Sequence, residues 1–248
     1  SGAGLTRTFP AAISTFRIGS YTTGGNGHPG ALDDFRIYPA ALDGAPILLC
    51  LAEETRPGRP VPDPADLARL VAGIMGLPAP PRLQVIAHGR PSGFVALDRA
   101  RRLIAAGEDP VVILGLDSYL TAQSIAHYLG QDRLLVPGNA NGFIPGEAAA
   151  AILCTSAPGP LRMTGLGLAR EVAHIYNGAD KDGLDLPLRG DGMTRAYRDA
   201  LAAANCDMEV ISYRISDISG EQYYFKQAAL ASLRTEAGHR EFRDLWAP

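Results

Sequence analysis

The sequence predicts an α/β protein in which helices cover a largely parallel or mixed β-sheet. From Ala45 onward, apolar segments that look like buried strands alternate with segments of helical periodicity. Up to about Asp43 the pattern is instead short, glycine-rich and β-like, with no helical segment. We therefore expect two parts, a short β segment over residues 1–44 and an α/β domain over residues 45–248.

The first strand of the α/β part is expected at 46–52, where PILLCLA is continuously apolar, as in a strand buried on both faces. After a proline-dense loop, Asp63 is suited to cap a helix that Pro64 begins and Gly76 ends. The same reasoning predicts further strands at 83–87, 111–116, 148–154 and 208–215, and further helices at 92–106, 118–129, 191–205 and 221–234.

Composition excludes several classes of function. The net charge is −3 and no basic block stands out, so we expect no nucleic-acid partner. No apolar run is long enough to span a bilayer and the N-terminus lacks the basic and apolar pattern of a signal peptide, so we expect a cytoplasmic protein that does not bind membranes. The cysteines Cys50, Cys154 and Cys206 are far apart, and we expect them to be reduced and buried. Because no metal-ligand cluster and no phosphate-binding glycine motif occurs, we expect neither metal nor cofactor.

Several motifs together resemble a known family. They are DPVVILGLDS at 109–118, Arg133-Leu-Leu, and GFIPGEAAAAIL at 142–153, separated by a helical segment. In this order they resemble the β-ketoacyl synthase branch of the thiolase fold, over roughly residues 46 to 245. The resemblance implies a layered thiolase-like fold in which small residues on the alanine-rich strand let the central helices pack closely on the sheet. It also implies that Glu147 lies close to the active-site region.

The catalytic positions of that family are changed in this sequence. The segment 85–104 resembles the strand, elbow and helix that carry the nucleophilic cysteine, but Arg90 stands at the cysteine position. The segment 188–194 resembles the loop of the first catalytic histidine, and Arg189 stands at that histidine. The second histidine would follow Trp246, so we expect a C-terminally truncated domain, incomplete at both ends.

An arginine cannot serve as the nucleophile because it stays protonated at any accessible pH. We therefore expect no standard catalytic residue, and the candidate stand-ins are His88, Ser92 and Cys154. Each also has a structural interpretation: His88 as a satisfied, partly buried histidine, Ser92 as a helix cap, and Cys154 as a core residue.

A narrower resemblance is to degenerate thiolase-like proteins associated with type VI secretion. It implies a non-catalytic adaptor or co-chaperone in effector loading, whose partners are a secretion effector or another adaptor. The alternative is an acyltransferase of the 3-oxoacyl-carrier-protein synthase class that uses a non-standard nucleophile and takes acyl-carrier-protein or coenzyme A thioesters. The family also implies a dimer formed near 83–87, either a homodimer or a heteromeric substitute for it. A third interpretation is an incomplete reading frame, which would give an aggregating product.

Residues 14–43 resemble a different family. The segment from Phe16 to Leu42 is similar to the last two strands of a laminin-G or concanavalin-like jelly roll. A two-strand remnant cannot build a core of its own, so we expect this segment either to pack on the α/β part or to remain loose.

Overall fold

The computed structural model describes residues 44–60, 63–75, 82–159, 161–175, 186–211, 213–236 and 243–246. The described residues form two compact units. The first holds the residues from Gly44 to Ser124 and from Gly146 to Pro158, and the second holds Ile125–Pro145 and the residues from Gly159 onward. The β segment expected over residues 1–44, with its jelly-roll resemblance, lies outside the described residues except for Gly44.

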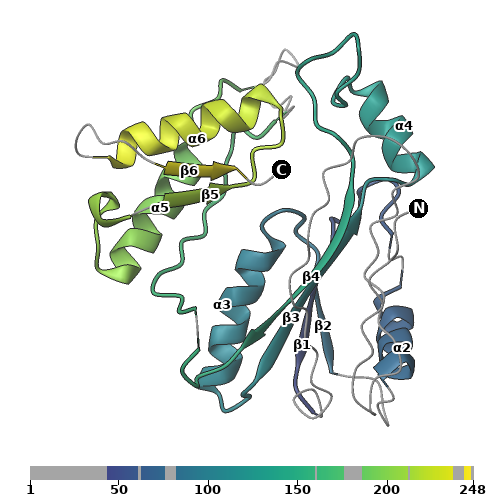
Figure 1. Cartoon of the computed structure of the whole chain (residues 1–248), viewed down its shortest axis with the longest axis vertical. Helices are drawn as coiled ribbons and strands as arrows, with labels where there is room; N and C mark the ends of the chain where they lie inside the picture. The colour runs from purple at the N-terminus through teal and green to yellow at the C-terminus, as the bar shows by residue number, and fades with distance from the viewer. Residues whose placement is uncertain are drawn as a thin grey trace, which may run out of the picture. The chain divides into compact units, whose positions relative to one another are not determined.

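The first unit is built on a four-stranded mixed sheet (Figure 1). Its strands are β1 (Ile47–Cys50), β2 (Leu83–Ile86), β3 (Val111–Ser118) and β4 (Glu147–Cys154), in the spatial order β2-β1-β3-β4. β1 is parallel to β2 and β3, whereas β4 is antiparallel to β3. The predicted α/β class with a mixed sheet is therefore confirmed.

Three helices belong wholly or partly to this unit: α2 (Pro64–Met75), α3 (Ser92–Ala105) and α4 (Ala122–Gly130). Asp63 Oδ1 accepts a hydrogen bond from the backbone N–H of Ala65 at 2.8 Å, which confirms the predicted start of α2. The predicted end at Gly76 lies outside the described residues. The helix predicted at 118–129 begins only at Ala122, because Ser118 is the last residue of β3 and its hydroxyl accepts from the N–H of Leu120 in the turn that follows.

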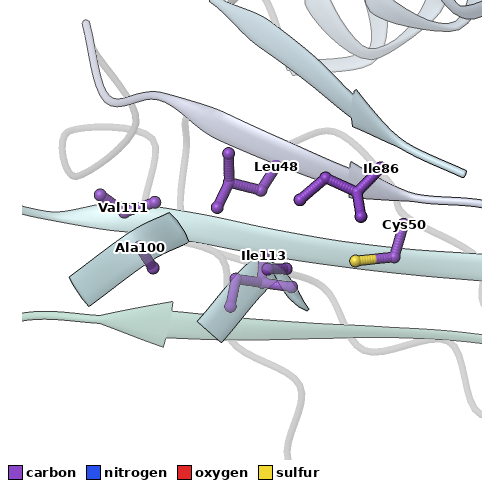
Figure 2. Close-up of a cluster of buried hydrophobic side chains, with 7 residues drawn as sticks. Leu48, Cys50, Ile86, Ala100, Val111 and Ile113 are labelled. Carbon is purple, nitrogen blue, oxygen red and sulfur yellow. The ribbon is translucent and has the colours of Figure 1, made fainter. Parts of the chain in front are cut away.

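The core of the first unit lies between α3 and one face of the sheet. Figure 2 shows apolar side chains of β1, β2 and β3 around Ala100 of α3. This cluster consists of Leu48, Cys50, Ile86, Ala96, Ala100, Val111 and Ile113. Ala96 and Ala100 are one helical turn apart and almost fully buried, so α3 approaches the sheet closely at this stripe. The neighbouring Leu49 is also fully buried although it points to the opposite face, which confirms that β1 is covered on both sides.

The alanine-rich strand differs from its expected setting. β4 forms an edge of the sheet, and Ile152 and Leu153 remain 53% and 52% exposed. Only Cys154 of this strand packs against the core cluster, as a partly buried neighbour. The small side chains of β4 therefore do not lie under a closely packed helix of the first unit, and the strand gains its order from the ladder with β3.

The second unit contains α5 (Asp191–Ala204), α6 (Gln222–Thr235) and a pair of parallel strands, β5 (Tyr213–Ser216) and β6 (Arg243–Trp246). The two helices pack against each other. The strand predicted at 208–215 is instead a 3₁₀ turn over Met208–Val210, in which Met208 is buried, followed by the strand β5. No helix of the described residues is both long and apolar enough to cross a membrane.

Candidate functional site

The turn between β2 and α3 holds three of the predicted site residues, His88, Arg90 and Ser92. Gly89 has a φ of +65°, a left-handed conformation that a glycine adopts without strain. Its N–H donates to the carbonyl of Leu51 at 3.2 Å, and its own carbonyl accepts from the N–H of Ser92 at 3.0 Å. The turn is thus fixed on the end of β1, and α3 leaves it in a defined direction.

Ser92 is buried, with 2% of its surface exposed, and its hydroxyl is fully engaged by the backbone. Its Oγ accepts from the N–H of His88 at 2.9 Å and donates to the carbonyl of Leu51 at 3.2 Å. The expected role as a helix cap is wrong, since Pro91 occupies the capping position and no side chain caps α3. A serine nucleophile needs a base that accepts its proton, and a peptide carbonyl cannot do so. The hydroxyl therefore serves to tie the turn to β1.

His88 and Arg90 are both exposed on the same turn. His88 therefore differs from the partly buried histidine that was expected. The carboxylate of Glu53 also approaches the turn, because a Cβ added at Gly89 would come within 2.1 Å of Glu53 Oε1. The turn thus presents an acid, a histidine and an arginine beside a serine that is not available for attack.

The thiols of the first unit are poor nucleophiles. Burial raises the pKa of Cys50 to about 11, and burial also raises the pKa of Cys154. Both shifts keep the thiol protonated near neutral pH, whereas the thiolate is the reactive form. All three cysteines are free. Cys50 is buried as expected, whereas Cys154 and Cys206 are only partly buried, so the expectation of burial is wrong for these two.

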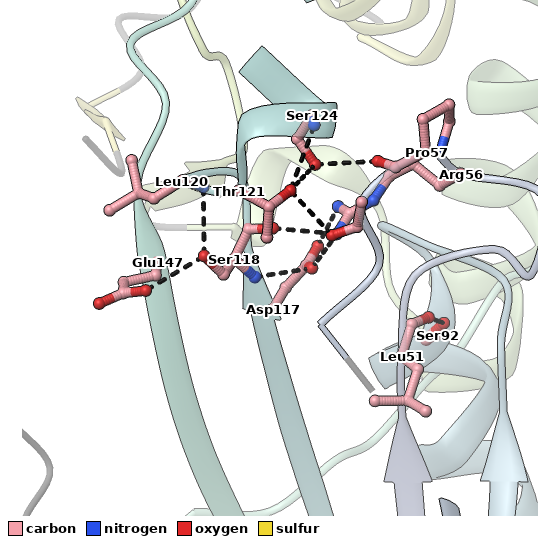
Figure 3. A network of polar contacts seen from close by, with 11 residues as sticks. Leu51, Arg56, Pro57, Ser92, Asp117, Ser118, Leu120, Thr121, Ser124 and Glu147 are labelled. Carbon is pink, nitrogen blue, oxygen red and sulfur yellow. Dashed lines mark hydrogen bonds and ion pairs between the residues drawn. The ribbon is translucent and has the colours of Figure 1, made fainter. Parts of the chain in front are cut away.

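A polar network at the ends of β1 and β3 lies in the same unit (Figure 3). Arg56, which is 8% exposed, donates through Nη1 to Asp117 Oδ2 at 2.6 Å and through Nη2 to both Asp117 Oδ1 and the carbonyl of Ser118. Its guanidinium also lies 4.5 Å from the ring centroid of Tyr119. Burial alone would lower the pKa of Arg56, but the hydrogen bonds and charge of Asp117 outweigh it, so the pKa is raised and Arg56 stays cationic.

The same network holds the loop after β1 against the start of α4. Ser124 donates to the carbonyl of Pro57 at 2.9 Å, and Thr121 donates to the carbonyl of Gly58 at 3.1 Å. Sequence reasoning missed this network. The dense prolines at 57–62 were the available signal, since such a loop needs specific partners to be ordered.

Glu147, which the family resemblance implies near the active site, is exposed at the start of β4. Its Oε2 accepts from the hydroxyl of Ser118 at 3.1 Å, so it joins the ends of β3 and β4. Among the described residues, Glu147 therefore has as its hydrogen-bond partner the side chain of Ser118 on the adjacent strand.

Arg189 belongs to the second unit, where it precedes α5 and is mostly exposed. Its Nε lies 2.9 Å from Asp191 Oδ2. The same unit contains a buried ion pair that sequence reasoning missed: Arg133 donates to Glu221 through Nε at 2.8 Å and Nη2 at 2.9 Å. Among the residues that the structure describes, no group of three or more His, Cys, Asp or Glu side chains is arranged to hold a metal ion.

Comparisons with known proteins give the fold a name. No protein-family model matches the sequence, and no curated protein matches it. Solved ketosynthase structures do match. A type II polyketide acyl-carrier protein in complex with its ketosynthase contains a similar chain, with a TM-score of 0.55 and 19% identity over 74% of this chain and 48% of that one. This chain has the thiolase-like ketosynthase fold.

Two further structures agree. The ishigamide ketosynthase/chain length factor has a TM-score of 0.56 and 18% identity, over 82% of this chain and 56% of that one. An oxazolomycin ketosynthase domain from Streptomyces albus has a TM-score of 0.55 and 14% identity, over 82% of this chain and 39% of that one. The chain therefore spans about half the length of the ketosynthases that it matches.

Proposed function

We propose that this chain is a non-catalytic protein of the thiolase-like ketosynthase fold that acts by binding other proteins. The state of Ser92 is the observation that carries the proposal. Its hydroxyl donates to a backbone carbonyl and is buried, while the adjacent Arg90 cannot act as a nucleophile. The raised pKa values of Cys50 and Cys154 also support the proposal, because they keep both thiols of the first unit protonated and therefore unreactive toward an acyl group.

In its specific form, the proposal is a cytoplasmic adaptor or co-chaperone that helps load a type VI secretion effector. By the family resemblance, Arg90 and Arg189 stand at the positions of the catalytic cysteine and the first catalytic histidine. These two changes support a non-catalytic role. Ketosynthases of this fold have been solved with an acyl-carrier protein or a chain length factor, which supports protein binding as a use of the scaffold. We further propose that residues 45–248 form this domain, that residues 1–44 are a jelly-roll remnant, and that the chain can form a homodimer.

The test is intact-mass spectrometry of the folded protein after incubation with acetyl- and malonyl-coenzyme A and with the corresponding acyl-carrier-protein thioesters. We expect an unmodified mass. An adduct that maps to His88, Ser92 or Cys154, and that disappears in the matching alanine variant, would establish the acyltransferase instead. A cooperative thermal transition in the same sample shows that the protein is folded and contradicts the interpretation as an incomplete, aggregating product.

A further inference from the structure

The second unit carries an arginine-lined hollow of about 540 Å³. Arg195 and Arg198 come from α5, Arg189 precedes this helix, and Arg234 is in the last turn of α6. Two carboxylates, Asp191 and Asp199, also line it. Four guanidinium groups thus face two carboxylates, and the hollow has an excess of positive charge in a chain whose net charge is −3.

The hollow already binds carboxylates of its own chain. Asp191 bridges two arginines, since Oδ1 lies 2.9 Å from Arg234 Nη1 and Oδ2 lies 2.9 Å from Arg189 Nε. Arg195 Nε lies 3.7 Å from Asp199 Oδ2, a looser pair. The guanidinium fork matches a carboxylate in shape and charge, so these contacts show the chemistry that the hollow accepts.

The arginines are held in place but remain accessible. Arg234 is fixed by donating to the carbonyl of Arg189 as well as to Asp191, and Arg198 Nη2 donates to the carbonyl of Arg234 at 3.0 Å. In contrast, the side chains of Arg189 and Arg195 are 68% and 78% exposed. An incoming anion can therefore reach these two guanidiniums without displacing a buried contact.

We propose that this hollow is a docking site for an acidic segment of a protein partner. The inference rests on the proposed function, because it names the chemistry by which the protein would bind another. A single small anion would stay largely hydrated among such exposed arginines and would bind weakly, since exposed ion pairs contribute little each. Several carboxylates on one acidic peptide segment can contact the four arginines at the same time. Because the peptide backbone joins these carboxylates, each contact after the first is effectively intramolecular.

The test uses the full chain and a fluorescein-labelled hexaglutamate peptide, with the matching hexaglutamine peptide as its neutral counterpart. Binding is followed by fluorescence anisotropy at low and at physiological salt. We expect binding of hexaglutamate only, weakened by added salt as screening requires. The double variant Arg195→Gln/Arg198→Gln should bind about 10- to 25-fold more weakly, because each of the two exposed arginine–carboxylate contacts is worth about three- to fivefold.

A matched control separates the hollow from overall charge. The double variant Arg99→Gln/Arg101→Gln removes the same two charges from the exposed side of α3 in the first unit and should leave the affinity within about twofold. A resident carboxylate competes with the peptide, so Asp199→Asn should strengthen binding. Circular dichroism melts of each variant confirm that the helices are retained.

Three outcomes would overturn the inference: no hexaglutamate binding, equal weakening in the α3 control, or inorganic phosphate at millimolar concentration displacing the peptide completely. The last outcome would identify a small-anion site. None of them bears on whether the chain forms an acyl adduct, so a failure here leaves the proposed non-catalytic function to be decided by the mass measurement.

Discussion

Replacing Glu221 by glutamine removes the charge that neutralises Arg133 inside the second unit. Glu221 is 1% exposed and the side chain of Arg133 is 14% exposed, so the pair is shielded from water. Burial alone would lower the pKa of Arg133, but the hydrogen bonds and charge of Glu221 outweigh it and raise the pKa above its usual range. Arg133 stays charged in the variant because an arginine remains protonated at any accessible pH, and no carboxylate then lies opposite its guanidinium.

The expected loss follows from this geometry. Removing one partner of a buried, hydrogen-bonded ion pair costs about 3–5 kcal/mol, because the other charge is left uncompensated. The guanidinium also lies 5.2 Å from the ring centroid of Tyr128 and 5.8 Å from that of Phe143, which offsets part of the loss. We expect about 3 kcal/mol for Glu221→Gln, or a fall in Tm of roughly 6–12 °C at this chain length.

The assay is a double-mutant cycle by urea unfolding, with Glu221→Gln, Arg133→Met and the double variant. The double variant should be more stable than the sum of the single losses predicts, because neither charge is left alone. Asp199→Asn is the exposed comparison, and it should cost less than about 0.5 kcal/mol. Two results would show that Arg133 and Glu221 do not form a stabilising buried pair: a loss of less than about 1 kcal/mol in the free energy of unfolding for Glu221→Gln, or single losses that add up to the loss of the double variant.

Three further predictions concern the first unit. Leu48→Ala should lower the free energy of unfolding by about 2–5 kcal/mol in urea titrations, because it opens a cavity under α3, and a loss below about 1 kcal/mol would contradict the described core. Gly58→Ala should cost about 2 kcal/mol or more by thermal unfolding, since Gly58 has a φ of +74° and a Cβ would lie 2.1 Å from Thr121 Oγ1; an unchanged Tm would show that the loop is not held as described. Cys50 should react slowly with iodoacetamide at pH 8 and faster as the pH rises toward about 11, because its raised pKa keeps the thiol protonated; rapid labelling of the folded protein at pH 8, read by peptide mass spectrometry, would count against this.

Local sequence patterns predicted most of the helices and strands because their signals are local. The continuous apolar run of β1, the cap at Asp63 and the periodicity of α3 and α5 each depend on neighbours within one or two turns. The errors arose where a tertiary contact decides the boundary. The start of α4 depends on Ser118 being held in β3 by its pairing with Glu147 of β4, which periodicity does not reveal.

The candidate site shows the same limit. The sequence placed His88, Arg90 and Ser92 on one turn, as the structure has them, but it assigned Ser92 the role of a cap. The carbonyl that binds its hydroxyl belongs to Leu51, 41 residues earlier, and comes near only through the pairing of β1 and β2. The pair of Arg133 and Glu221 spans 88 residues of chain, so only the folded second unit brings it together.

A turnover assay decides whether this ketosynthase fold is used for binding, as we propose, or for catalysis. Wild-type protein is incubated with acetyl- and malonyl-thioesters of both coenzyme A and acyl-carrier protein, and carbon dioxide and the condensed product are measured against a no-enzyme control and an active ketosynthase. We expect rates equal to those without enzyme, because neither Arg90 nor the buried Ser92 can carry the acyl group. Sustained turnover above that background by the folded protein would contradict it.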